Sequence, residues 1–136
     1  MRIGYAFGNE KLIGYLNDVK FAYNSYTMNK PSQVLGLEML RDKEYFEKIT
    51  SKIVSTREWT KKELSALGFT FPDSKTNFIF ASHETIPAKD IFTALEKENI
   101  FVRYFNKDRI SNHLRISIGT DEEMQTLVDF LKDYVK

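Results

Sequence analysis

The sequence Leu-Arg-Ile-Ser-Ile-Gly near the carboxy-terminal end of the chain alternates between apolar and polar residues. Its leucine and isoleucines share one face at the two-residue period of a β-strand, which leaves Arg115 and Ser117 on the opposite face. Gly119 then ends the alternation. The pattern predicts a half-buried strand that carries one arginine on its polar side.

Helical spacing begins directly after this strand. Thr120 and Glu123 have the spacing of a capping box, in which a hydroxyl and a carboxylate satisfy the free N–H groups at a helix start. The apolar residues that follow at helical steps are Met124, Leu127, Val128 and Leu131. We therefore predict that the strand runs directly into a final helix with one apolar face.

The same patterns predict the elements along the rest of the chain. In order, they are a strand at 3–7, a helix from Asn9 to about Lys20, an aromatic loop at 21–29, a helix that begins near Pro31, a long helix capped by Asp42 and ended by Gly68, strands at 69–71 and 77–81, a helix begun by Thr85 and Pro87, and a strand at 101–104. This order predicts an α/β fold, with an α+β domain in which helices cover a small sheet.

The long helix is expected to be the main scaffold of the domain. Its apolar face would be formed by Phe46, Ile49, Ile53, Leu64 and Leu67. Lysine, arginine and glutamate occupy its other faces, which predicts that those faces are solvated. Trp59 lies off the apolar stripe and is expected to cover the edge of the domain.

Composition narrows the class of protein. The chain has 136 residues, of which 42% are hydrophobic, and its 20 basic and 19 acidic side chains give a formal charge of +1. Such a balance argues against nucleic acid or an anionic membrane as partner. No cysteine, signal peptide or long apolar run is present, so a cytoplasmic location is expected. His83 and His113 lack neighbours at metal-ligand spacing, so we interpret both as ordinary loop or strand-edge histidines and expect no metal.

Several segments resemble one family of enzymes when they are taken in order. The carboxy-terminal signature comprises Val-Arg-Tyr-Phe at 102–105 and Leu-Arg-Ile-Ser-Ile-Gly-Thr at 114–120, and the other segments are 2–9, 23–26 and 76–80. Together they are similar to histidinol-phosphate aminotransferases, which are pyridoxal-phosphate enzymes of fold type I, the aspartate-aminotransferase fold. The resemblance implies that residues 1–30 are a remnant of the large cofactor-binding domain and that 31–136 form the small carboxy-terminal domain.

The resemblance also implies roles for individual residues. Arg115 matches the arginine that holds the oxyanion of the substrate, and Arg103 matches a second arginine that helps to hold the phosphate of histidinol phosphate. Arg2 matches the arginine that contacts the phosphate of the cofactor. Asn24 and Tyr26 lie in a family motif near the active site, but no role is assigned to them. The implied reaction converts histidinol phosphate and 2-oxoglutarate to imidazole acetol phosphate and glutamate, in a homodimeric enzyme of histidine biosynthesis.

The family pattern places the Schiff-base lysine upstream of Arg2, where this chain has only Met1. We therefore expect no catalytic residue within the chain, no pyridoxal phosphate bound by the chain alone, and no transamination by it in isolation. A strand at 3–7 would also lack the rest of its sheet, so we expect it to fray or to pair with another copy.

Three other interpretations stay open from the sequence. Arg115 and Arg103 could simply be solvated arginines on an exposed sheet face. Within the same fold, the chain could belong to an aromatic amino-acid aminotransferase or to a phosphothreonine decarboxylase. A non-catalytic interaction module is the alternative from a different class, since the lysine is missing.

Overall fold

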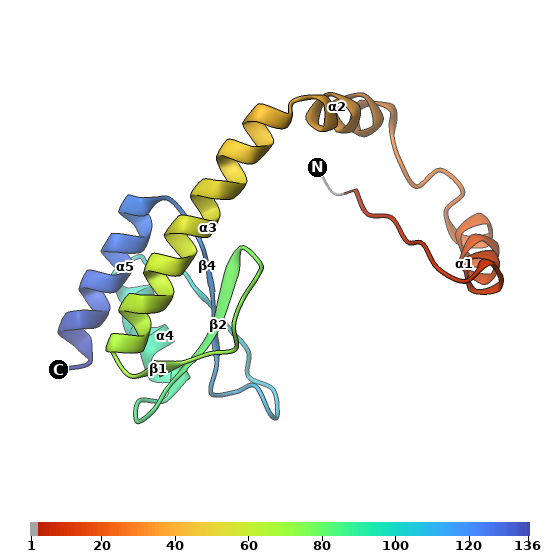
Figure 1. Ribbon diagram of the computed structural model, residues 1–136. Helices are drawn as coiled ribbons and strands as arrows, with labels where there is room; N and C mark the ends of the chain where they lie inside the picture. Colours follow the sequence, from red (N-terminus) through yellow and green to blue (C-terminus); the bar gives the residue numbers. More distant parts are fainter. Residues whose placement is uncertain (1–2) are drawn as a thin grey trace. The chain divides into compact units, whose positions relative to one another are not determined.

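The computed structural model describes residues 3–136, so the predicted cofactor contact Arg2 lies outside the described residues. Packing divides the chain into two compact units, Met1–Glu47 and Lys48–Lys136 (Figure 1). The family resemblance implies a boundary between residues 30 and 31. That boundary separates the domains of the family rather than these two units, and it stays a prediction. The two units are described separately.

The first unit contains α1 (Glu10–Tyr23), α2 (Lys30–Arg41) and the first turn of α3 (Lys43–Ala66). Both shorter helices begin as predicted. The Asn9 side chain accepts a hydrogen bond from the backbone N–H of Lys11 at 3.0 Å, and Asn29 accepts one from Ser32 at 2.9 Å. These asparagines satisfy N–H groups that have no partner inside the helix.

One expectation for this unit is met and one was wrong. The segment 3–7 forms no strand paired within the described chain, in agreement with the expectation that it would fray or pair with another copy, because every strand pair in residues 3–136 belongs to the sheet of the second unit. The aromatic segment after α1 begins later than predicted, because the helix continues to Tyr23. Neither α1 nor α2 buries a residue, so these helices have no core of their own in the described chain.

The second unit is built on a four-stranded antiparallel sheet in the order β1-β2-β4-β3. The bounds of its strands and remaining helices are β1 Phe69–Thr70, β2 Phe78–His83, β3 Arg103–Tyr104, β4 Leu114–Ser117, α4 Ala88–Lys97 and α5 Asp121–Tyr134. One core joins the sheet to the helices, with Leu64 from α3, Ile79 and Ile116 from the sheet, Ile91 from α4 and Leu127 from α5. Because β2 and β4 contribute alternate residues to this core, the helices cover one face of the sheet and leave the other face open.

The carboxy-terminal part of the unit confirms its predicted pattern. Leu114 and Ile116 are buried, and Arg115 and Ser117 are exposed. The Thr120 hydroxyl accepts a hydrogen bond from the Glu123 N–H at 3.2 Å, and the Glu123 carboxylate accepts one from the Thr120 N–H at 2.7 Å. This reciprocal capping box starts α5, and its predicted apolar stripe is buried in full.

The predicted faces of α3 need two corrections. Arg57 is only 5% exposed, although arginines were assigned to the solvated faces. It is buried because its guanidinium donates a hydrogen bond to the Thr76 carbonyl at 3.0 Å and pairs with Glu58 at 2.9 Å. Phe46, assigned to the apolar face, is instead 62% exposed. Trp59 packs partly buried against the core.

Gly68 ends the long helix, as predicted, with a left-handed φ of 82° that favours glycine. The next helix, α4, begins differently from the prediction. Thr85 lies outside it, and Pro87 at its N-cap offers no side-chain hydrogen bond. The Asn112 amide oxygen, from the loop before β4, accepts the hydrogen bond from the Ala88 N–H at 2.9 Å. A distant residue therefore completes the first turn of α4.

Candidate functional site

The register of the sheet brings the two predicted substrate arginines together. Arg103 on β3 is the direct partner of Arg115 on β4, and Phe80 on β2 is the partner of Arg115 on its other side. Directly paired residues on antiparallel strands point to the same face. Since Arg115 is on the exposed side of β4, both arginines lie on the face that the helices leave open.

Aromatic rings surround these arginines. The guanidinium carbon of Arg115 lies 5.6 Å from the ring centre of Phe78, and that of Arg103 lies 5.5 Å from the ring centre of Phe105. We call the surface formed by these four residues with Phe80 and His113 the open sheet face. Contact with these rings restricts where the guanidinium groups can point, which prepares them to bind a ligand.

The two arginines have no counter-charge in the described part of the chain. Neither forms an ion pair or a hydrogen bond there, in contrast to the buried Arg57. Like charges placed directly opposite each other destabilise a sheet, and an anion between them would remove the repulsion. A guanidinium presents two parallel donors that match a carboxylate or a phosphate. The arrangement can therefore hold an anion.

The aromatic residues and His113 were not predicted from the sequence to belong to this surface. The two-residue period of a strand could have indicated two of them, because His113 precedes Arg115 by two residues and Phe105 follows Arg103 by two. Asn24 and Tyr26 belong to the other compact unit, where Asn24 ends α1 and Tyr26 is exposed. Nothing in the described geometry gives either of them a role.

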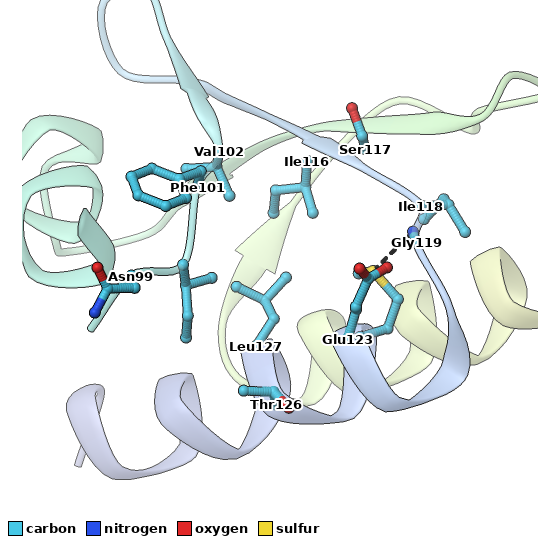
Figure 2. Close-up of a pocket in the computed structure, with 12 residues that line it drawn as sticks. Asn99, Phe101, Val102, Ile116, Ser117, Ile118, Gly119, Glu123, Thr126 and Leu127 are labelled. Carbon is cyan, nitrogen blue, oxygen red and sulfur yellow. Dashed lines mark hydrogen bonds between the residues drawn. The ribbon is translucent and has the colours of Figure 1, made fainter. Parts of the chain in front are cut away.

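A hollow of about 450 Å³ lies on the helix side of the sheet, between residues 99–102 and α5. Figure 2 shows that its lining is largely aliphatic, with Val102, Ile116 and Leu127 among the side chains drawn. The single ionisable lining residue, Glu123, is occupied by the capping box. This hollow lacks groups that could perform acid–base chemistry or bind an anion, so it is not the candidate site.

The open sheet face does not fit pyridoxal phosphate by itself. Its polar groups are guanidinium and imidazole, and it contains no lysine amine that could form an imine with an aldehyde. Within residues 3–136 no group of three or more histidine, aspartate or glutamate side chains could hold a metal ion. In the same range no helix is both long and apolar enough to span a bilayer.

Comparison with known proteins agrees with the family resemblance of the sequence. The sequence profile of "Aminotransferase class I and II" matches residues 1–131. A histidinol-phosphate aminotransferase of Clostridium botulinum (strain Okra / Type B1) is 51% identical over 135 residues, which are 99% of this chain and 38% of that protein. The chain thus spans little more than a third of the length of the curated relatives that it matches.

Solved structures show the same fold at lower identity. The histidinol-phosphate aminotransferase of Clostridium acetobutylicum superposes with a TM-score of 0.78 at 21% identity, over 90% of this chain and 38% of that one. The Sinorhizobium meliloti enzyme, solved in complex with pyridoxal-5'-phosphate, gives 0.76 at 23% identity, over 90% of this chain and 34% of that one. The predicted fold type I small domain, with its sheet and covering helices, is therefore confirmed. The chain belongs to the aminotransferase class I and II family.

Proposed function

We propose that this chain provides the part of a histidinol-phosphate aminotransferase that binds the anionic group of the substrate. The reaction would transfer an amino group from histidinol phosphate to 2-oxoglutarate, giving imidazole acetol phosphate and glutamate in histidine biosynthesis. The observation that carries the proposal is the direct pairing of Arg103 with Arg115 on the open sheet face, without a counter-charge in the described chain. The 51% identity to the enzyme of that name in Clostridium botulinum supports the choice of substrate.

The two arginines would divide the work of holding the substrates. Arg115 would bind the α-carboxylate of glutamate or 2-oxoglutarate and the phosphate of histidinol phosphate, because its paired donors suit both groups. Arg103 would add a second cation when the ligand is a phosphate dianion, which a monoanionic carboxylate does not require. The aromatic contacts of both guanidinium groups would keep them oriented before the ligand arrives.

Pyridoxal phosphate would supply the electron sink for this reaction when it is bound in the complete protein. We assign to Arg2 a contact with the cofactor phosphate, as the family resemblance implies. The lysine and the remaining cofactor contacts would come from other parts of the protein, so this chain alone is proposed to be inactive. A homodimeric assembly and a cytoplasmic location complete the proposal.

A chimeric enzyme tests this function. The carboxy-terminal part of the Clostridium botulinum relative would be replaced by this chain, and transfer from histidinol phosphate to 2-oxoglutarate would be measured. We expect turnover, and we expect Arg115→Lys to raise KM for histidinol phosphate about tenfold or more, because a lysine cannot form two parallel hydrogen bonds. Arg109→Lys is the matched control, since Arg109 is exposed in the loop before β4.

The same chimera separates the alternatives. Transfer from phenylalanine without transfer from histidinol phosphate would assign the chain to an aromatic aminotransferase, and release of CO₂ from phosphothreonine would assign it to a decarboxylase. A folded chimera with none of these activities would overturn the enzymatic proposal and leave the interaction module. Equal KM values for the unsubstituted and Arg115→Lys chimeras would remove Arg115 from the site.

A further inference from the structure

His113 lies on the open sheet face beside the paired arginines. It directly precedes β4 and is two residues from Arg115, so by the strand period both side chains belong to the same face. Its imidazole stacks on Phe80, the cross-strand partner of Arg115, with ring centres 4.6 Å apart and an angle of 10° between the planes. Its backbone N–H donates a hydrogen bond to the Ile110 carbonyl at 3.1 Å. The stack on Phe80 restrains the ring, and the hydrogen bond holds the backbone from which it extends.

The two ring nitrogens of His113 have different surroundings. Nδ1 is the single buried side-chain nitrogen or oxygen without a hydrogen-bond partner in residues 3–136. Nε2 is not among such buried atoms and has no partner in that range either, so it reaches solvent. A proton on Nδ1 would be buried without an acceptor, which is unfavourable. We therefore assign the proton to Nε2, which makes this nitrogen a hydrogen-bond donor at the surface.

We infer that the Nε2–H group of His113 is a third donor to the anion held by Arg103 and Arg115, and that it makes this site prefer a phosphate monoester to a carboxylate. The inference rests on the proposed function, because it places the ligand between the two arginines. The stack favours one orientation of the ring, so its N–H is already oriented when the ligand binds. His113 would be a specificity-determining residue with no role in proton transfer.

The number of donors explains the preference. A carboxylate has two oxygens in one plane, and a single guanidinium satisfies both. A phosphate monoester has three terminal oxygens in a tetrahedral arrangement and carries close to two charges. Two guanidinium groups and one N–H together offer a donor to each of these three oxygens, so loss of the N–H should weaken phosphate binding much more than carboxylate binding.

The experiment uses the 136-residue chain with nitrogen labelling. Methyl phosphate and acetate are titrated separately, and NMR follows the imidazole nitrogens of His113 and the backbone amides of β4. We expect the proton on Nε2 and a change in the Nε2 signal with methyl phosphate. We expect His113→Phe, which keeps a stacking ring, to weaken methyl phosphate about tenfold, the loss typical of one hydrogen bond to a charged group. Acetate binding should change by less than about twofold.

Thermal unfolding distinguishes this role from a structural one. His113→Phe removes the buried Nδ1, so its Tm should equal or exceed that of the unsubstituted chain. A purely structural histidine would give a lower Tm and equal losses for both ligands, and that result would overturn the inference. A proton found on Nδ1, or unchanged phosphate affinity in His113→Phe, would do the same.

Two arginine variants keep the two proposals separate. If Arg115→Gln loses methyl phosphate binding while His113→Phe retains it, the role of His113 fails and the arginine site stands. If Arg115→Gln binds as well as the unsubstituted chain, or the unsubstituted chain binds no methyl phosphate, both proposals fail. Arg109→Gln removes one positive charge from the exposed loop and should leave the affinity unchanged.

Discussion

His83 connects the end of α3 to the turn before α4, and its replacement should be costly although it lies outside the candidate site. Its Nδ1 accepts hydrogen bonds from the N–H groups of Ile86 at 3.1 Å and Thr85 at 3.2 Å. Nε2 must then carry the proton, which it donates to the Leu67 carbonyl at 2.8 Å. The ring also meets Phe69 edge-on, with ring centres 4.9 Å apart.

The loss expected for His83→Ala follows from these contacts. The hydrogen bonds at 2.8 and 3.1 Å contribute about 1 kcal/mol each, and the edge-on aromatic contact adds about 0.5 kcal/mol or more. Water can reach part of this site because the residue is half-buried. We therefore expect a loss of about 2 kcal/mol in the free energy of unfolding, or a fall in Tm of about 10 °C for a domain of this size.

Urea unfolding followed by tryptophan fluorescence measures this loss. Trp59 is the only tryptophan of the chain and packs against the same core, so its emission reports on this unit. Two matched variants separate the bonds, since His83→Asn keeps an acceptor near the position of Nδ1 and His83→Gln keeps a donor near that of Nε2. Each should fall between His83→Ala and the unsubstituted chain. A change below about 0.5 kcal/mol in His83→Ala, or no recovery in either matched variant, would refute the reasoning.

Three further predictions concern stability. Thr120→Ala should cost about 1 kcal/mol, because it removes the hydroxyl of the capping box, and a urea midpoint equal to that of the unsubstituted chain would contradict this. Leu64→Ala, at a fully buried position, should cost about 3 kcal/mol by leaving a cavity, whereas the exposed Leu40→Ala should change the urea midpoint little. The Lys61 ammonium, 2.6 Å from Asp73, holds the pKa of that carboxyl below its ordinary 3.8. This stabilisation is present above the pKa of the unfolded chain and is lost as pH falls through the lower pKa of the folded chain. The urea midpoints at about pH 3 and pH 6 should therefore differ less in Asp73→Asn than in the unsubstituted chain. The same difference in both proteins would count against the contact.

The sequence predicted those elements best whose pattern is local. The strand at 114–117 and the following helix depend on neighbouring residues and on a capping box of four consecutive positions, and both are confirmed. Arg57 could not be assigned to the interior, because its burial depends on the Thr76 carbonyl, 19 residues away in the sequence. The segment 3–7 has the pattern of a strand but forms no strand pair in the described chain, as expected for a strand that lacks the rest of its sheet.

The candidate site, like the fold, was predicted only in part from the sequence. The family resemblance selected Arg103 and Arg115 separately, and only the register of β3 against β4 makes them direct partners. The stacking of His113 on Phe80 also depends on that register, and the orphaned Nδ1 could not be seen without coordinates. The site roles of these arginines and of Arg2 stay predictions until they are tested by substitution.

Asn112 would connect an anion bound on the open sheet face to the start of α4. Its amide oxygen holds the first turn of α4, and the next residue in the chain is His113. An anion bound by the imidazole would therefore also restrain the backbone next to Asn112 and reduce the opening of that turn, and deuterium exchange at the Ala88 amide should slow when ligand is added. In Asn112→Ala the exchange rate of the Ala88 amide should no longer respond to ligand. Exchange at the Ala88 amide would therefore report whether an anion is bound on the open sheet face.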